Sequence, residues 1–271
     1  MDYTTLEYRV EDGIATITLQ RPDKGNAVNS SMSRELPKVW AAFEQDRSAR
    51  VAIITGAGER AFCVGADLAD LPATDGEGAE ATLNSIRWSP LQNQVSKPVI
   101  CAVNGMAVGG GLHFVAESDM VIAADHATFF DTHVKVGLVA GLEPVVLARR
   151  MPLEAVMRLA LTGGAERFSA QRARELGLVG EVVPASELQA AARALAASVC
   201  RHSPTALARS KRAIWQSKEL GLSEALQFAW NQIAEHIGHP DSVEGGRAFL
   251  ERREPRWAEY AVDRTDAGDD A

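Results

Sequence analysis

Three short apolar runs, each bounded by glycine, proline or aspartate, constrain the fold of this 271-residue chain most strongly. The runs are ARVAIITGAG (49–58), KPVICAVNG (97–105) and DMVIAAD (119–125). A short apolar run that is rich in branched residues and enclosed by turn residues is typical of a buried strand. Stretches with helical character separate the runs. This alternation predicts an α/β chain built from stacked strand–strand–helix units.

The N-terminal segment predicts a β-hairpin followed by a helix. In YRVEDGIATITLQRPD (8–23), two runs of alternating residues flank an aspartate–glycine pair, which is a frequent hairpin turn. Beyond it, we expect Ser31 or Ser33 to cap a helix that runs to about Gln45. If Ser33 is the cap, Pro37 falls in the first turn, where proline is tolerated.

A change of pattern near residue 186 divides the chain. The strand–helix alternation occupies residues 1–185, which we expect to form the core, and residues 186–258 carry successive segments with helical periodicity. Residues 259–271 are small and acidic, so they predict a disordered tail. The segment 72–90 begins polar and glycine-rich, and it predicts a mobile loop that leads into a helix.

Composition narrows the class of protein and its partners. A hydrophobic fraction of 46% with 24% charged residues is ordinary for a soluble globular protein. The net charge of −8 argues against nucleic acid as a partner, because phosphate binding needs a basic surface. No apolar run approaches the roughly 18 residues of a membrane span, so we expect no membrane partner. The three cysteines lack CxxC spacing and are expected to be buried thiols in a reducing, cytoplasmic setting.

Two glycine-rich turns predict a site built from backbone amides. GGGLHF (109–114) opens an amphipathic segment, and AFCVGADL (61–68) follows a predicted strand. Glycine lets the backbone approach a ligand with its N–H groups free. Neither turn matches the GxxxxGK[ST] phosphate loop or the GxGxxG dinucleotide motif. One interpretation is that an amide from each turn converges on a single carbonyl oxygen, and the other is that these are only tight, closely packed turns.

Five motifs, in order along the chain, resemble the enoyl-CoA hydratase/isomerase (crotonase) superfamily. They are RPDKGNAVN (21–29), AFCVGADL (61–68), KPVICAVNGMAVGGGLHF (97–114), TGGAERFSAQRARELGLVGEVVP (162–184) and EGGRAFLERREP (244–255). The resemblance covers about residues 5–256. It implies a crotonase-type α/β fold, a spiral of ββα units with a C-terminal helical trimerisation region, assembled as a homotrimer or hexamer. It also implies acyl-CoA thioester substrates, as in fatty acid metabolism, with coenzyme A as part of the substrate and no separate cofactor.

The resemblance assigns the backbone amides of Ala66 and Gly110 to an oxyanion hole, which binds the thioester carbonyl and stabilises the enolate formed from it. Five residues match positions that line the family's coenzyme A channel: Lys24, Gly25, Val64, Asp67 and Leu68. The family usually has a basic residue at position 23 and a small apolar residue at position 24. Here the pair is Asp23-Lys24, so the basic residue stands one position later than usual. Whether Lys24 makes the family's contact with the phosphates of coenzyme A is therefore left open.

The chain departs from the family at two catalytic positions. The typical hydratase has glutamates at positions 113 and 133, which hold and activate water, whereas this chain has histidines at both. Imidazole can accept or donate a proton near neutral pH. We therefore expect His133 to act as general base and His113 to orient water or act as an acid. Glu143, at a predicted helix start, is expected to support them.

Each of these residues also has a purely structural interpretation. His113 has Glu117 one helical turn further on and can pair with it, and Asp131 can orient His133 or simply end a strand. Glu143 can be a carboxylate placed at a helix N-terminus to complement the helix dipole. The spacing of the histidines does not match a helical metal site, so no metal is predicted.

Three functions follow as alternatives. The first is water addition or double-bond isomerisation on an enoyl-CoA thioester. The second is hydrolytic carbon–carbon cleavage of a β-dicarbonyl-CoA ester, because a β-diketone hydrolase of the superfamily has a histidine near position 133 and an acidic residue near position 142. The third is a non-catalytic acyl-CoA-binding protein that has lost the catalytic glutamates.

Overall fold

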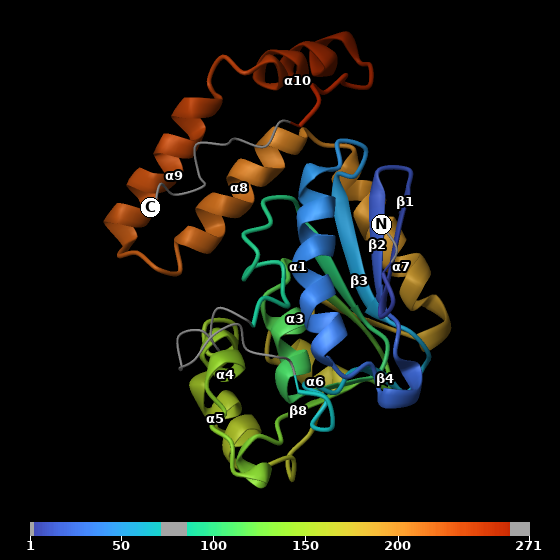
Figure 1. The fold of residues 1–271 in the computed structure, drawn as a ribbon. Coiled ribbons are helices and arrows are strands. Elements are labelled where there is room, and N and C mark those ends of the chain that lie inside the picture. Colours follow the sequence, from blue (N-terminus) through green and yellow to red (C-terminus); the bar gives the residue numbers. More distant parts are fainter. Residues whose placement is uncertain (1–2, 72–85, 261–271) are drawn as a thin grey trace, which may run out of the picture.

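Two sheets form the centre of the chain in a computed structural model, which describes residues 3–71 and 86–260 (Figure 1). The larger sheet has the strand order β1-β2-β3-β5-β7-β10, and the smaller sheet has the order β4-β6-β8-β9. The strands are β1 (Leu6–Glu11), β2 (Ile14–Leu19), β3 (Val51–Gly56), β4 (Ala61–Cys63), β5 (Val99–Val103), β6 (Met106–Val108), β7 (Met120–Ala124), β8 (Thr128–Phe130), β9 (Phe168–Ser169) and β10 (Glu181–Val183).

From β3 to β8, successive strands alternate between the two sheets. β3, β5 and β7 are parallel neighbours in the larger sheet, and each is followed along the chain by a strand of the smaller sheet, β4, β6 or β8. The strands β4, β6 and β8 are themselves parallel neighbours. The chain therefore advances as a spiral of strand–strand units, which confirms the predicted α/β architecture and brings the segments after β4, β6 and β8 to one end of the smaller sheet.

The predicted N-terminal hairpin is confirmed, but the predicted helix cap is wrong. β1 and β2 pair antiparallel around Asp12 and Gly13. The helix that follows, α1 (Ser30–Gln45), is capped by Asn29, whose side chain accepts a hydrogen bond from Met32 N at 3.0 Å. Asparagine caps at least as well as serine, and it starts the helix early enough to place Pro37 inside it.

Helices cover both faces of the larger sheet (Figure 1). α1 lies on one face and α7 (Leu188–Cys200) lies on the other. Strand β3 is buried along its whole length, with Ala52 and Ile54 in the core cluster of α1 and with Val51 and Ile53 in the cluster of α7. Burial on both faces explains why this strand reads as a continuous apolar run rather than an alternating one.

The C-terminal part is helical, as predicted. After α7 come α8 (Pro204–Gln216), α9 (Leu222–His236) and α10 (Pro240–Glu251), which extend beyond the sheets in Figure 1. Ser203 caps α8 by accepting a hydrogen bond from Ala206 N at 3.1 Å. Gly221 is the N-cap of α9.

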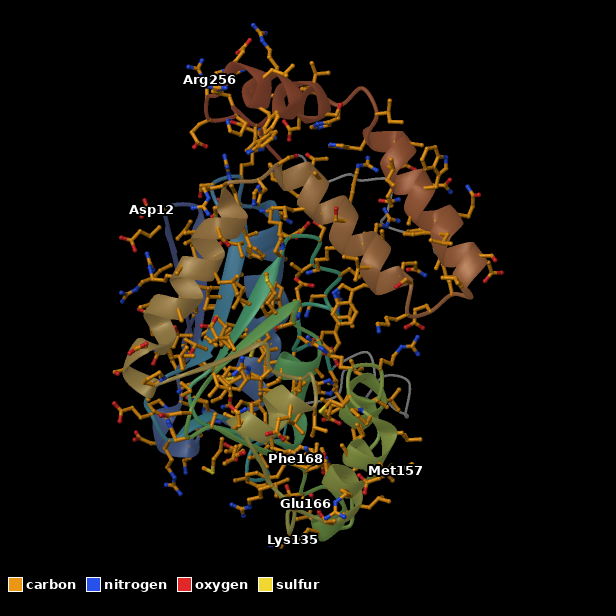
Figure 2. The ribbon with its side chains drawn as sticks, turned by 180° about the vertical axis from the view of Figure 1, so that it is seen from behind. Asp12, Lys135, Met157, Glu166, Phe168 and Arg256 are labelled. Atoms are coloured by element: carbon orange, nitrogen blue, oxygen red, sulfur yellow. The ribbon has the colours of Figure 1, made fainter. Side chains whose placement is uncertain are left out.

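The remaining helices lie near the smaller sheet. They are α3 (Leu112–Ala116), α4 (Leu142–Leu147), α5 (Leu153–Leu161) and α6 (Ala170–Glu175). Figure 2 shows Met157 of α5 and Arg256, which follows α10, at opposite ends of the molecule. Most of the predicted 72–90 loop and of the 259–271 tail lies outside the described residues. Among the helices that the structure describes, none combines the length and apolar character that a membrane crossing requires.

Candidate active site

The two glycine-rich turns are in direct contact. Gly65 has a φ of +89°, and a Cβ at this position would lie 2.9 Å from Gly110 N and 3.0 Å from Val108 O. Real Cβ atoms are not found that close to backbone, so only glycine allows the two turns to approach. The contact brings together the segments that carry the predicted amide donors, those of Ala66 and Gly110.

The surrounding hydrogen bonds leave both amides available. Val28 and Ala66 form an isolated parallel β-bridge, in which Val28 N donates to Gly65 O at 2.8 Å and Asp67 N donates to Val28 O at 2.9 Å. The N–H of Ala66 takes no part in these two hydrogen bonds. Within the described part of the chain, the Ala66 N–H has no protein acceptor. Gly110 is the second residue of the 3-10 turn η2 (Gly109–Gly111). The first N–H groups of a helical turn have no acceptor within that turn, so η2 leaves the N–H of Gly110 free. Two free N–H groups on adjoining turns are the donors that an oxyanion hole would need.

His133 is held by the carboxylate two residues before it. Asp131 follows β8 and is fully buried, and its Oδ1 accepts hydrogen bonds from His133 N at 2.8 Å and from His133 Nδ1 at 3.0 Å. Nδ1 therefore carries the proton of the neutral ring, and Nε2 is the basic nitrogen. The hydrogen bond with Asp131 raises the pKa of His133, and the nearby Glu143 adds to the rise while burial opposes it.

His113 forms a second pair of the same kind, deeper in the protein. Its Nδ1 lies 2.6 Å from Glu117 Oε1 one turn further along the chain, and both side chains are buried. Burial opposes the charged imidazole, but the hydrogen bond and charge of Glu117, together with Glu143, outweigh it and raise the pKa of His113. The other oxygen of Glu117 accepts a hydrogen bond from Ser89 Oγ.

Glu143 joins the two pairs. It lies in the first turn of α4, and its Oε1 is 3.3 Å from His113 Nε2 and 4.0 Å from His133 Nε2. The side chain of His133 is 22% exposed, whereas those of Glu143 and His113 are only 7% and 2% exposed. The three predicted residues therefore form one cluster, and His133 is the member most open to a ligand.

The whole chain resembles one family of known proteins. The model of the enoyl-CoA hydratase/isomerase family matches residues 9–260. The chain belongs to this family of enzymes. It is 35% identical over 260 residues to carnitinyl-CoA dehydratase of Proteus mirabilis, over 93% of this chain and 98% of that protein. It is also 35% identical over 255 residues to (E)-benzylidenesuccinyl-CoA hydratase of Thauera aromatica, over 93% and 97% of the two chains.

Solved structures of the same family confirm the crotonase-type fold of this chain. An enoyl-CoA hydratase/isomerase from Mycobacterium paratuberculosis has a TM-score of 0.86 and 39% sequence identity, and the match covers 94% of this chain and 99% of that chain. An enoyl-CoA hydratase from Bacillus anthracis has a TM-score of 0.84 and 30% identity, over 94% and 99% of the two chains.

Two of the predicted coenzyme A residues, Gly25 and Val64, pack together next to the Ala66 turn. Gly25 has a φ of +59°, and a Cβ there would lie 3.0 Å from the side chain of Val64. Val64 N also donates to Gly25 O at 3.1 Å. These residues hold two chain segments together, and their contact with coenzyme A stays a prediction.

The other three predicted coenzyme A residues differ in how their side chains are engaged. Asp67 accepts a hydrogen bond from Arg21 at 2.8 Å, so its carboxylate already has a cationic partner. Leu68 is 65% exposed, and Lys24 is an exposed residue at the end of the 3-10 turn η1 (Pro22–Lys24). Leu68 and Lys24 are thus free to meet a ligand, whereas Asp67 also serves to fix the turn beside Ala66.

Sequence reasoning missed two polar residues beside His113. Ser89 donates to Glu117, and Gln92 Nε2 lies 3.3 Å from His113 Nδ1. A signal for them was present, because Ser89-Pro90-Leu91-Gln92 has the serine–x–x–glutamine pattern of a capping box. The pattern predicts a local turn at residues 89–92, but it does not predict that this turn lies beside α3.

Cys63 lies behind the Ala66 turn and has no sign of reactivity. It is fully buried, and burial raises the pKa of its thiol to about 12. Among the described residues, no group of three or more His, Cys, Asp or Glu side chains has the arrangement of a metal site.

Proposed function

We propose that this enzyme catalyses reversible hydration of the α,β double bond of an enoyl-CoA thioester, with His133 as general base. The observation that carries the proposal is the position of Glu143 Oε1 between the Nε2 atoms of His133 and His113. Family membership supports acyl-CoA chemistry, and this cluster supplies the groups that water addition needs.

The thioester carbonyl is expected to accept hydrogen bonds from the amides of Ala66 and Gly110. Attack of water at the β-carbon pushes electrons toward this oxygen, and the enolate that forms carries negative charge there. Fixed N–H donors stabilise that charge more than they stabilise the neutral substrate, so they lower the barrier. The close contact of Gly65 with Gly110 supports this role, because it keeps the two donors together.

The proton transfers centre on His133. Its neutral ring has Nδ1–H bonded to Asp131, which leaves Nε2 to take a proton as water attacks the β-carbon. The resulting imidazolium lies beside Glu143, whose negative charge stabilises it, and returns the proton to the α-carbon of the enolate. The substrate gains OH at one carbon and H at the other, and His133 ends neutral as it began.

His113 acts as a positioning residue in this mechanism. Its Nε2 lies 3.3 Å from Glu143 Oε1, so it acts on that carboxylate. The pairing with Glu117 favours the protonated ring, whose Nε2–H then donates to Glu143 and fixes that carboxylate toward His133.

The relatives support the hydration and dehydration direction. Those named carnitinyl-CoA dehydratase and (E)-benzylidenesuccinyl-CoA hydratase both carry that reaction type in their names. We further propose a homotrimer or hexamer, because apolar side chains such as Trp230 of α9 and Leu161 of α5 are more than half exposed. The free thiols of the three cysteines fit a cytoplasmic protein.

The test is to follow the enoyl-thioester absorbance with crotonyl-CoA and a longer enoyl-CoA, beside a β-dicarbonyl-CoA ester of matched length. Saturable loss of the enoyl absorbance that collapses in His133→Ala supports hydration. Cleavage of the β-dicarbonyl ester alone would replace hydration with carbon–carbon hydrolysis, for which the Asp131–His133 pair would activate water. Tight binding of every thioester with no turnover would leave only a binding protein.

A further inference from the structure

A cavity of about 670 Å³ lies beside His113 and Glu117. Part of its wall is apolar and comes from Ile86, Leu91, Leu142, Val145 and Val146. The polar part comes from Arg87, Gln92, Gln94, His113 and Glu117. The ring of Trp88 connects the cavity wall to the predicted oxyanion hole, because it packs edge-on against His113 and a Cβ on Gly110 would lie 2.8 Å from it. Its place fits the acyl group of a bound thioester.

The amide group of Gln92 has a fixed orientation in this cavity. Its Oε1 accepts hydrogen bonds from two backbone donors, Trp88 N at 2.9 Å and Ser89 N at 3.0 Å. Two N–H donors require an oxygen, so the assignment of the amide follows from chemistry. Ser89 Oγ accepts in turn from Gln92 N at 3.2 Å, which completes a capping box. The NH₂ group of Gln92 must therefore face His113 and the cavity.

His113 cannot satisfy that NH₂ group. Gln92 Nε2 lies 3.3 Å from His113 Nδ1, but Nδ1 already faces Glu117 Oε1 at 2.6 Å. If Nδ1 carries a proton, it is a donor opposite another donor. If it does not, its single lone pair is taken by a protonated Glu117. Among the described residues, no other acceptor lies within hydrogen-bond distance of Gln92 Nε2, so a donor is left directed at the cavity.

We propose that Gln92 is a specificity-determining residue, whose NH₂ group binds an oxygen atom carried by the acyl group beyond the reacting double bond. The inference rests on the proposed function only in taking the ligand to be an acyl-CoA thioester. The substrate class is then acyl chains that bear a carbonyl or carboxylate oxygen, rather than plain alkyl chains. Arg87 lines the same cavity and adds a positive charge, which favours a carboxylate. The apolar wall accepts the carbon chain between the two ends.

The test compares three six-carbon saturated acyl-CoA thioesters that end in a methyl group, a methyl ketone or a carboxylate. Saturated thioesters do not react, so calorimetry measures binding alone. The wild-type protein is expected to bind the two oxygenated ligands about 10- to 100-fold more tightly than the alkyl ligand. Gln92→Glu keeps the oxygen of the capping box but loses the donor, so it is expected to abolish the preference for the ketone and reverse that for the carboxylate.

Two further variants separate the contributions. Gln171→Met removes an exposed amide of α6, outside the cavity, and is expected to leave all three affinities unchanged. Arg87→Ala is expected to weaken only the carboxylate ligand. Equal binding of the three ligands by the wild-type protein, or a Gln171→Met variant that loses the preference as Gln92→Glu does, would overturn the proposal. If the wild-type protein shows the binding preference but hydrates no enoyl-CoA, the role of Gln92 stands and the proposed reaction is rejected.

Discussion

Replacing Glu117 by glutamine tests whether a buried charge sets the protonation of His113. Both side chains are at most 3% exposed, and the atoms that join them are 2.6 Å apart. The substitution keeps the shape and one hydrogen-bonding oxygen but removes the negative charge. A hydrogen bond to a charged partner is worth about 1.5–3 kcal/mol, so the free energy of unfolding should fall by about 2 kcal/mol where His113 is protonated. With the charge gone, burial dominates and the pKa of His113 falls.

The pH dependence of this loss has a defined sign. Glu117 raises the pKa of His113 in the folded state, so its stabilising effect is fully present below the ordinary histidine pKa of about 6.5 and decreases as the pH rises through the higher folded value. Urea unfolding of the wild type and of Glu117→Gln, at about pH 5.5 and about pH 8.5, measures the difference. Turnover near neutral pH should fall roughly tenfold, equivalent to about 1.4 kcal/mol of barrier, because Glu143 loses a charged donor.

Glu175→Gln is the matched control, because this exposed carboxylate pairs with Arg172 at 3.0 Å on the surface of α6. An exposed pair is worth about 0–1 kcal/mol, so the control should show a small loss and normal turnover. The reasoning is refuted if Glu117→Gln costs no more than the control, or if its cost grows as the pH rises.

Three further changes have definite expected outcomes. Asp131→Asn removes the main cause of the raised His133 pKa. In steady-state assays, the rising limb of the pH profile of kcat/KM should therefore move to lower pH, and its plateau should fall. A limb that does not move would show that another group is the base. Gly110→Ala puts a Cβ 2.8 Å from the Trp88 ring. It should lower the free energy of unfolding, measured by thermal unfolding, by about 1–3 kcal/mol and lower kcat about 100-fold. Normal turnover would show that the amide donor lies elsewhere. Asn29→Ala should cost about 1 kcal/mol in urea unfolding with kcat unchanged, because it removes a helix cap and an exposed hydrogen bond to Asp70.

The sequence predicted features that depend on neighbouring residues. The aspartate–glycine turn of the first hairpin and the optional pairing of His113 with Glu117 are both local, and the structure contains each of them. The cap of α1 was misassigned because Asn29 and Ser33 carry similar local signals, and only the packed position of the helix selects between them. In the fold Ser33 Oγ accepts a hydrogen bond from Trp88 Nε1 at 2.9 Å instead.

Features that join distant segments were beyond local reasoning. Glu143 meets two histidines that precede it by 30 and 10 positions, and the three residues come from separate elements. These residues come together because the chain after β8 runs back past α3. The packing of both sheets, and not the local sequence, determines that path. The orientation of Gln92 likewise follows from a local capping box, but its place beside His113 depends on long-range packing.

The most direct test of the central claim is the kcat/KM for enoyl-CoA hydration in His133→Ala beside the wild type, with the affinity for a saturated acyl-CoA measured on both. Removal of a general base typically costs about 10²- to 10⁴-fold in rate. The account predicts a loss in that range with affinity changed by less than roughly threefold, because the amides of Ala66 and Gly110 still bind the carbonyl. Hydration that proceeds at the wild-type rate without His133 would contradict it.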